Sequence, residues 1–347
     1  MTPRRSASLL VAGLIMLSLA AAGTVTAKGH LNVLLEGLSS PKGIIAGPKS
    51  VFVSQGWVSA PGPVLEWLRT GRNMGTARPT TDPINLVDIT GTSDGAGWGI
   101  GGDGVLYRQA GPGAAIEAVL DILAYQAADI DPSDINGDPA ESNPNGLAPL
   151  GVDVLIADAA GNDLLRVTPE GDAVTVARWV TEVVPSFIPG LPSEVPAEAV
   201  PTTVAIGPDG WAYVGQLIGF PGTPGTAHIW RVNPWAEDAV CDVENETADC
   251  SVWRSGFTSI FDIAFNDRNG ALYVYEIAED GWLAFEAGFE TGEFPPAVLL
   301  QVKGNKTREL VRGQLSQPGG VSIAPNGAIY VTDGMFTGGR LLQITGS

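Results

Sequence analysis

The chain is poor in the residues that build most catalytic and metal centres. It has only two histidines and two cysteines in 347 residues, which leaves little material for a zinc site. Charged residues make up 16% of the chain, and 38 acidic residues against 19 basic ones give a net charge of −19. Because such a surface repels phosphate groups, we expect no nucleic-acid partner. The sequence also contains no nucleophile elbow, phosphate-binding loop or Cys/His pair.

Long apolar runs are lacking after the N-terminus. Residues 1–27 have the features of a secretion signal peptide: two arginines, an apolar core over residues 9–22 and a small-residue cleavage site ending at Ala27. A rival cleavage site lies at residues 20–22. We therefore expect a protein secreted to the periplasm or the medium, without a membrane span, in which residues 28–347 form a single domain.

Turn-forming residues are abundant, with 45 glycines and 26 prolines. One pattern recurs: a short apolar run, a turn such as Pro-Asp-Gly, and a second apolar run with an aromatic residue near its start. Six copies align on an aromatic column of Phe52, Tyr107, Leu155, Tyr213, Tyr273 and Tyr330. Successive copies are separated by 48 residues (107 to 155) to 60 residues (213 to 273), which is room for four short strands each. The sequence therefore predicts an all-β fold, a six-bladed β-propeller with four-stranded blades.

The two ends of the chain are predicted to meet in one sheet. Residues 31–37 resemble residues 308–313, which end the blade before the last copy, and residues 31–36 are expected to form a strand. The last copy has no fourth strand of its own after residues 341–344. An N-terminal strand that joins the last blade would close the ring and remove an exposed sheet edge. We expect the closed propeller to be a monomer.

Two long segments between the copies are candidates for function. Residues 59–83 are either a lid or binding loop, or a surface connection without a role of its own. Residues 129–141 carry acidic side chains at the spacing of a calcium loop, although Pro139 stands where an EF-hand needs glycine and Asn145 where it needs glutamate. A looser calcium site and a solvated acidic loop both remain open. The calcium ligands would be Asp129, Asp131, Asp134, Asn136 and Asp138.

The two cysteines and one histidine have structural explanations. In a secreted chain, Cys241 and Cys250 are expected to form a disulfide, which stabilises the fold by roughly 2–3 kcal/mol. His228 alternates with apolar neighbours, so we expect it in a strand with a structural role.

Polar residues recur at the ends of the predicted inner strands. Three residues after the aromatic column lie Gln55, Ala110, Asp158, Gln216, Glu276 and Asp333. Just before the first strand of each pair lie Lys42, Ala96, Asn145, Thr202, Phe261 and Gly319. The resulting candidates for lining the central channel are Asn145, Asp158, Asp262, Glu276, Asp333, Gln55 and Gln216. Their oxygens hold a cation, or act as an acid and a base, or form hydrogen bonds to one another and to water.

Several strings of the sequence resemble the ScyD/ScyE family. They are Val200-Pro-Thr-Thr-Val-Ala-Ile-Gly-Pro-Asp-Gly, Tyr213-Val-Gly-Gln-Leu-Ile-Gly-Phe-Pro, Glu141-Ser-Asn-Pro-Asn-Gly-Leu and Ala157-Asp-Ala-Ala-Gly-Asn-Asp-Leu-Leu-Arg166. The resemblance covers nearly the whole chain after the signal peptide and implies a secreted propeller of NHL type, without a settled activity. Residues 67–83 lack the cysteine pattern expected of many relatives.

A more distant resemblance links Asn145-Gly-Leu to the gluconolactonase (regucalcin-like) propellers, in which such an asparagine is a metal ligand. The other ligand positions are occupied here by Lys42, Ala96, Thr202 and Phe261. We therefore predict a binding or scaffold module without catalysis, for an extracellular small molecule, polysaccharide or protein, and with no required cofactor. The alternative is a metal-dependent hydrolase, lactonase or tailoring enzyme with its site at the central channel.

Overall fold

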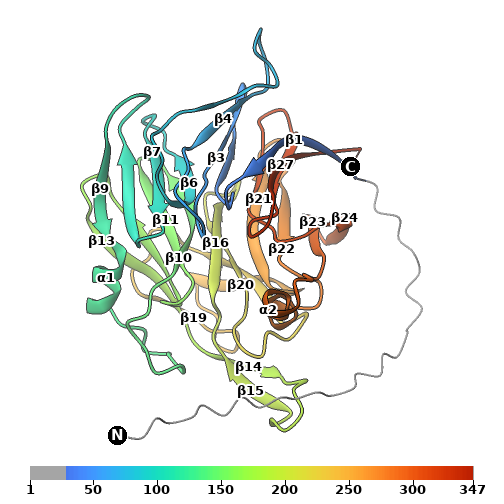
Figure 1. Ribbon diagram of the computed structural model, residues 1–347. Helices are drawn as coiled ribbons and strands as arrows, with labels where there is room; N and C mark the ends of the chain where they lie inside the picture. The colour runs from blue at the N-terminus through green and yellow to red at the C-terminus, as the bar shows by residue number, and fades with distance from the viewer. Residues whose placement is uncertain (1–28, 347) are drawn as a thin grey trace, which may run out of the picture.

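Four-stranded antiparallel sheets repeat around a central axis in the computed structural model, which describes residues 29–346 (Figure 1). The first strand of each sheet is innermost, and the first strands of neighbouring sheets pack against each other around the axis. The fold is therefore the predicted six-bladed propeller. The predicted signal peptide, residues 1–27, lies outside the described residues.

The first three blades follow one another along the chain. Blade 1 comprises β2 (Ile44–Ala46), β3 (Ser50–Val53), β4 (Leu65–Leu68) and β5 (Ala77–Pro79). Blade 2 comprises β6 (Leu86–Gly91), β7 (Gly97–Gly101), β8 (Val105–Gln109) and β9 (Ile116–Asp121). Blade 3 comprises β10 (Pro144–Leu150), β11 (Asp153–Asp158), β12 (Asp163–Val167) and β13 (Ala173–Trp179), with β19 (Ala239–Cys241) added as a fifth, parallel strand.

The other three blades complete the ring. Blade 4 comprises β16 (Pro201–Ile206), β17 (Ala212–Gln216), β18 (Ala227–Val232) and β20 (Cys250–Phe257). Blade 5 comprises β21 (Ile260–Asn266), β22 (Ala271–Glu276), β23 (Ala297–Lys303) and β24 (Lys306–Leu315). Blade 6 comprises β25 (Val321–Ile323), β26 (Ile329–Asp333), β27 (Gly339–Thr345) and the N-terminal β1 (His30–Leu38).

The N-terminal strand closes the propeller as predicted. β1 pairs antiparallel with β27, from His30 opposite Thr345 to Leu38 opposite Gly339. This pairing gives blade 6 its fourth strand. The ends of the described chain therefore share one sheet, which leaves β27 without an exposed edge.

The predicted alignment of the second copy is wrong by one strand. Tyr107 lies on β8, the third strand of blade 2, and its place in the aromatic column belongs to Trp98 on β7. The sequence from residue 97 to 107 does form a hairpin, but this hairpin joins the second and third strands. The first strand, β6, lies upstream of it. With the corrected alignment, the channel positions of blade 2 belong to Gly101 instead of Ala110 and to Val87 instead of Ala96.

Residues 59–83 are not a free lid. They include β4 and β5, which are the outer two strands of blade 1. Sequence reasoning missed these strands because they are only four and three residues long and are separated by a turn rich in glycine and polar residues. The turn between them extends away from the sheets in Figure 1.

Additions to the blades gather on one side of the propeller, at the bottom of Figure 1. They are helix α1 (Ile122–Ala128) with the loop after it, the hairpin of β14 (Glu182–Pro185) and β15 (Glu194–Ala197), and helix α2 (Trp282–Thr291). Among residues 29–346, neither helix is long and apolar enough to cross a membrane.

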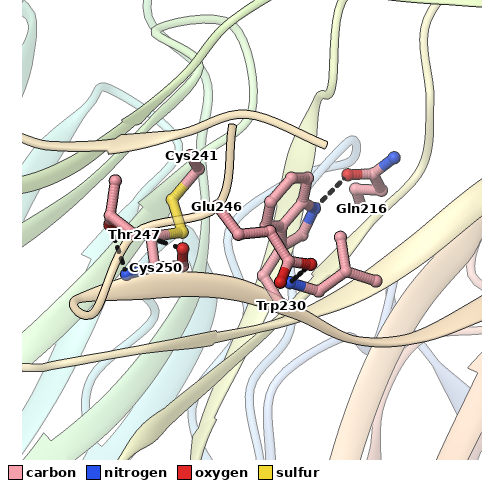
Figure 2. Close-up of a disulfide and its surroundings, with 7 residues drawn as sticks. Gln216, Trp230, Cys241, Glu246, Thr247 and Cys250 are labelled. Atoms are coloured by element: carbon pink, nitrogen blue, oxygen red, sulfur yellow. Dashed lines mark hydrogen bonds between the residues drawn. A yellow bond between two sulfur atoms is a disulfide. The ribbon is translucent and has the colours of Figure 1, made fainter. Parts of the chain in front are cut away.

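The predicted disulfide links two blades. Cys241 on β19 belongs to the sheet of blade 3, whereas Cys250 begins β20 in blade 4, and the two are bonded (Figure 2). The loop between them is held by Thr247, which exchanges hydrogen bonds with Cys250, and by Glu246, which accepts from the Val252 N–H at 3.0 Å. The disulfide therefore clamps the edge of blade 3 to the outer strand of blade 4.

Candidate functional site

Five of the predicted channel candidates follow the aromatic column by three residues, and we call them the polar ring: Gln55, Asp158, Gln216, Glu276 and Asp333. The polar ring mainly fixes the loops that lead into the blades. Four of its side chains lie at the end of a second strand or, for Gln55, two residues after it, and accept a backbone N–H from the segment before the first strand of the same blade. These bonds are Ser39 to Gln55 (2.9 Å), Asn143 to Asp158 (2.7 Å), Thr258 to Glu276 (2.7 Å) and Ser316 to Asp333 (2.8 Å). Each of these side chains therefore satisfies a donor of its own blade, as buried polar groups usually do.

The fifth member, Gln216, belongs to a different network in blade 4. Its amide donates to the buried Glu182 carboxylate at 3.0 Å, and its oxygen accepts from the Trp230 indole, as Figure 2 shows. His228 lies in β18, as predicted, with its Nε2 atom 3.1 Å from Glu182. The histidine thus helps to pair the buried carboxylate that begins the β14–β15 hairpin.

The central channel contains two half-buried carboxylates that bridge neighbouring blades. Asp262 in β21 accepts from the Thr203 hydroxyl of blade 4 at 2.7 Å and from the Val321 N–H of blade 6 at 2.6 Å. Burial raises the pKa of Asp262 to about 6, and the negative charge of Asp88 adds to this rise, whereas Lys42 opposes it. Asp88 in β6 accepts from the Leu147 N–H of blade 3 at 2.9 Å. Burial raises the pKa of Asp88 as well.

Lys42 occupies the channel where a metal-dependent propeller would need a ligand. Its ammonium group donates to the backbone oxygen of Asn145 at 2.5 Å and lies 5.4 Å from the centre of the Phe261 ring. The Asn145 Oδ1 atom is buried, and among the described residues it has no hydrogen-bond partner. A fixed positive charge beside Asn145 is a poor setting for a divalent cation. Among residues 29–346, no three His, Cys, Asp or Glu side chains group to hold a metal.

Aromatic side chains lie over Phe261 and Lys42. The Trp57 ring is 6.1 Å from Phe261 and 6.0 Å from Phe336, and Phe285 of α2 is 5.9 Å from Phe336. Buried Leu217 and Met335 pack into the same cluster. These contacts cover the channel on the side that carries α2, so Lys42 and Phe261 are each only 3% exposed.

A pocket opens on the outer side of this aromatic cluster. We call it the rim pocket; its volume is about 360 Å³, within the range of roughly 300–1,000 Å³ for small-molecule sites. Its walls come from the loop after α1, from β15, from the segment after β17 and from α2. The polar, acidic and aromatic side chains in these walls are Asn136, Glu198, Phe220, Trp282 and Glu286.

Aromatic and acidic groups face the same space in the rim pocket. Phe220 is 56% exposed, and Trp282 stacks on Phe285 at 5.6 Å between ring centres, which holds the indole in place. Glu198 accepts from the Ile135 N–H at 3.2 Å and from the Asn136 side chain. Partial burial raises the pKa of Glu198, its bond from Ile135 lowers it, and the negative charges of Asp134 and Asp131 raise it further. Glu286 is exposed on α2.

The predicted calcium ligands do not converge. Asp129 pairs with Arg178 at 2.5 Å and accepts from Thr175, whereas the buried Asp131 accepts from the Ser133 N–H at 2.7 Å and from Asn162 at 3.0 Å. Asp134 accepts backbone N–H groups of its own turn, and Asn136 donates to Glu198. No side-chain hydrogen bond joins Asp138 to this set among the described residues. Protein donors therefore occupy most of the loop's oxygens, which favours the solvated acidic loop over the calcium site, and calcium binding itself stays untested.

Comparisons with known proteins bear on the fold. No family model matches the chain, and no curated sequence matches it. Solved structures do. A glucose dehydrogenase aligns with a TM-score of 0.55 and 14% identity, over 92% of this chain and 100% of that one. The soluble aldose sugar dehydrogenase of Escherichia coli aligns with a TM-score of 0.54 and 14% identity, over 92% of this chain and 100% of that one. A candidate gluconolactonase aligns with a TM-score of 0.54 and 15% identity, over 92% of this chain and 93% of that one. These likenesses show the fold alone. They agree with the distant resemblance to gluconolactonase-type propellers and lend no support to the ScyD/ScyE family.

Sequence reasoning missed the main residues of the rim pocket. Glu198 and Trp282 lie outside the repeated pattern, directly after the β14–β15 hairpin and on helix α2. The residues around Gly219 could have pointed to the pocket, because a turn-rich loop directly follows a strand end there.

Proposed function

We propose that this protein binds a hydroxyl-rich small molecule, such as a sugar or a sugar lactone, in the rim pocket. The observation that carries the proposal is the combination of aromatic rings (Phe220 and Trp282) with carboxylates (Glu198 and Glu286) around one pocket. Sugars have an apolar face of C–H groups that packs on aromatic rings, and hydroxyl groups that donate to carboxylates in strong, charge-assisted hydrogen bonds.

We propose further that the pocket hydrolyses a lactone or a related ester. Glu198 is half-buried and has a raised pKa, which suits a group that takes a proton from water as it attacks a carbonyl carbon. The bond between the carbonyl carbon and the ring oxygen then breaks, and the leaving oxygen takes up the proton that Glu198 received from water, which gives the hydroxy acid.

Two features support an enzymatic function. The compared structures of the same fold are named as sugar dehydrogenases and a candidate gluconolactonase, although a shared fold alone does not fix function. The pocket also brings two carboxylates, Glu198 and Glu286, to one small volume. Binding without catalysis is the second candidate, and the satisfied carboxylates of the polar ring favour it because they leave few free groups in the channel.

The test has a binding arm and a catalytic arm. Calorimetric titration of residues 28–347 with a panel of aldoses and aldonolactones should give saturable binding, and acid release from the lactones should exceed spontaneous hydrolysis. Glu198→Gln should abolish the enzymatic release, whereas Glu194→Gln, at an exposed position of the strand that ends just before Glu198, should not change it. Binding without acid release would reject the proposed hydrolysis and support a binding protein without catalysis. If no panel member binds, the proposal of sugar binding is rejected as well.

A further inference from the structure

The interface between blades 1 and 2 lacks side chains that fill the other five interfaces. In each second strand, the residues just before and just after the aromatic column pack against the preceding blade. Before the column, the other blades carry Val51, Val154, Ala212, Leu272 and Ile329, all of them buried. After it, they carry Val53, Ile156, Val214, Val274 and Val331, also buried. Blade 2 has Gly97 and Gly99 at these two positions.

The side chain missing at Gly97 coincides with a cleft of about 600 Å³, which we call the inter-blade cleft. A Cβ atom added to Gly97 would meet no heavy atom within 4 Å, so the space beside it is open. At Gly99 the space is filled, because a Cβ atom there would lie 2.9 Å from the Leu86 side chain. The walls are largely apolar and include Ile45, Phe52, Val64 and Leu86. Protein interiors are close-packed, with few voids larger than a water molecule, so a space of this size between two blades calls for an explanation.

Two arginines at the rim of the cleft give it an excess of hydrogen-bond donors. Arg78 uses its Nε and Nη2 groups on Glu66, and Arg108 uses Nη2 on Asp94 at 2.7 Å. The buried Nε of Arg108 has no acceptor among the described residues. Each guanidinium has five N–H groups, so most of these donors are free.

The carboxylates beside these arginines are already occupied. Glu66 accepts from the Ser50 hydroxyl at 2.5 Å with one oxygen and from Arg78 with the other. Asp94 accepts from the Thr92 hydroxyl at 2.6 Å with one oxygen and from Arg108 with the other. A ligand at this rim would therefore meet unused donors rather than unused acceptors.

We propose that the inter-blade cleft binds a small apolar carboxylate, whose hydrocarbon body replaces the side chain missing at Gly97 and whose carboxylate bonds to Arg78 and Arg108. The hydrocarbon body of the ligand shields the apolar walls of the cleft from water, and the guanidinium groups bind its carboxylate through short, charged hydrogen bonds. The cleft is separate from the rim pocket, which is lined by blade 4 and the added elements. This site is thus independent of the proposed sugar binding.

A pair of probes that differ only in charge tests the proposal. Calorimetry with 1-naphthylacetate and the neutral 1-naphthylacetamide should show the acid binding residues 28–347 at least about tenfold more tightly, because only the acid forms charged hydrogen bonds. Gly97→Val restores the side chain of the other blades, and we expect it to abolish binding of both probes without lowering the melting temperature.

Arginine variants then separate charge recognition from general effects. Arg108→Gln should reduce the affinity for the acid to that for the amide. Arg231→Gln is the matched control, because Arg231 lies opposite the column residue of blade 4 as Arg108 does in blade 2, and it pairs with Asp209 in the same way. It should leave both affinities unchanged. The proposal is overturned if Gly97→Val binds like the wild type, if acid and amide bind equally, or if neither binds at millimolar concentration.

Discussion

Replacing Glu276 by glutamine should remove much of the pH dependence of stability. The Glu276 carboxyl is 7% exposed at the end of β22, and burial raises its pKa from 4.5 to about 7. The Thr258 N–H opposes this rise, and the negative charge of Glu309 adds to it. The folded protein therefore keeps a proton here between about pH 4.5 and 7, where the unfolded chain has lost it.

The sign and size of the effect follow from this difference. The stabilisation from the raised pKa is complete below the unfolded pKa and is lost as the pH rises to about 7. At about 1.4 kcal/mol for each pH unit, the free energy of unfolding falls by roughly 3 kcal/mol over this range. Glutamine does not titrate and can still accept the Thr258 N–H with its oxygen. Glu276→Gln should therefore match the wild type near pH 4.5 and be more stable by roughly 3 kcal/mol at pH 8.

Urea unfolding at several values between pH 4.5 and 8 measures the effect. Asp262 also loses stabilisation as the pH rises to about 6, so the informative quantity is the difference between wild type and variant. Glu117→Gln, at an exposed position in β9, controls for the loss of one negative charge. The reasoning is refuted if Glu276→Gln and the wild type keep the same difference in stability at all these pH values.

Three further predictions concern stability. Asp333→Ala should cost about 3–5 kcal/mol in urea unfolding, because it leaves Arg340, the Tyr275 hydroxyl and the Ser316 N–H without their buried acceptor; a cost below 1 kcal/mol would contradict this. Replacing both Cys241 and Cys250 by serine should cost about 2–3 kcal/mol, and a reducing agent should then no longer change the melting temperature. Calcium after EDTA should leave the melting temperature unchanged, and a rise of several degrees would show a metal site that the described side chains do not form.

The repeated parts of the fold could be predicted from the sequence. An apolar run, a turn and a second apolar run mark the inner strands in five of six copies, and the closure by β1 follows from its likeness to β24. Blade 2 was aligned wrongly because its glycine-rich β7 and aromatic β8 imitate the pattern one strand too late. The short outer strands β4 and β5 carry too few residues to show an alternating pattern.

The candidate site was harder to predict than the fold. Asp158 and Asp333 were correctly placed at strand ends, but the sequence does not show which backbone N–H each carboxylate accepts. The rim pocket depends on contacts between segments that are far apart in the chain, such as Asn136 with Glu198 and the walls formed by Phe220 and Trp282. The open space beside Gly97 becomes visible only when the six blades are superposed by register.

Calorimetry on Trp282 variants tests the central claim, sugar binding in the rim pocket, most directly. The titrant is the tightest-binding member of the aldose and aldonolactone panel. Trp282→Ala removes the held aromatic face, so we predict about tenfold weaker binding. Trp235→Ala, at a ring that is 57% exposed outside the pocket, should leave the affinity unchanged. Equal affinities of Trp282→Ala and the wild type would contradict the account.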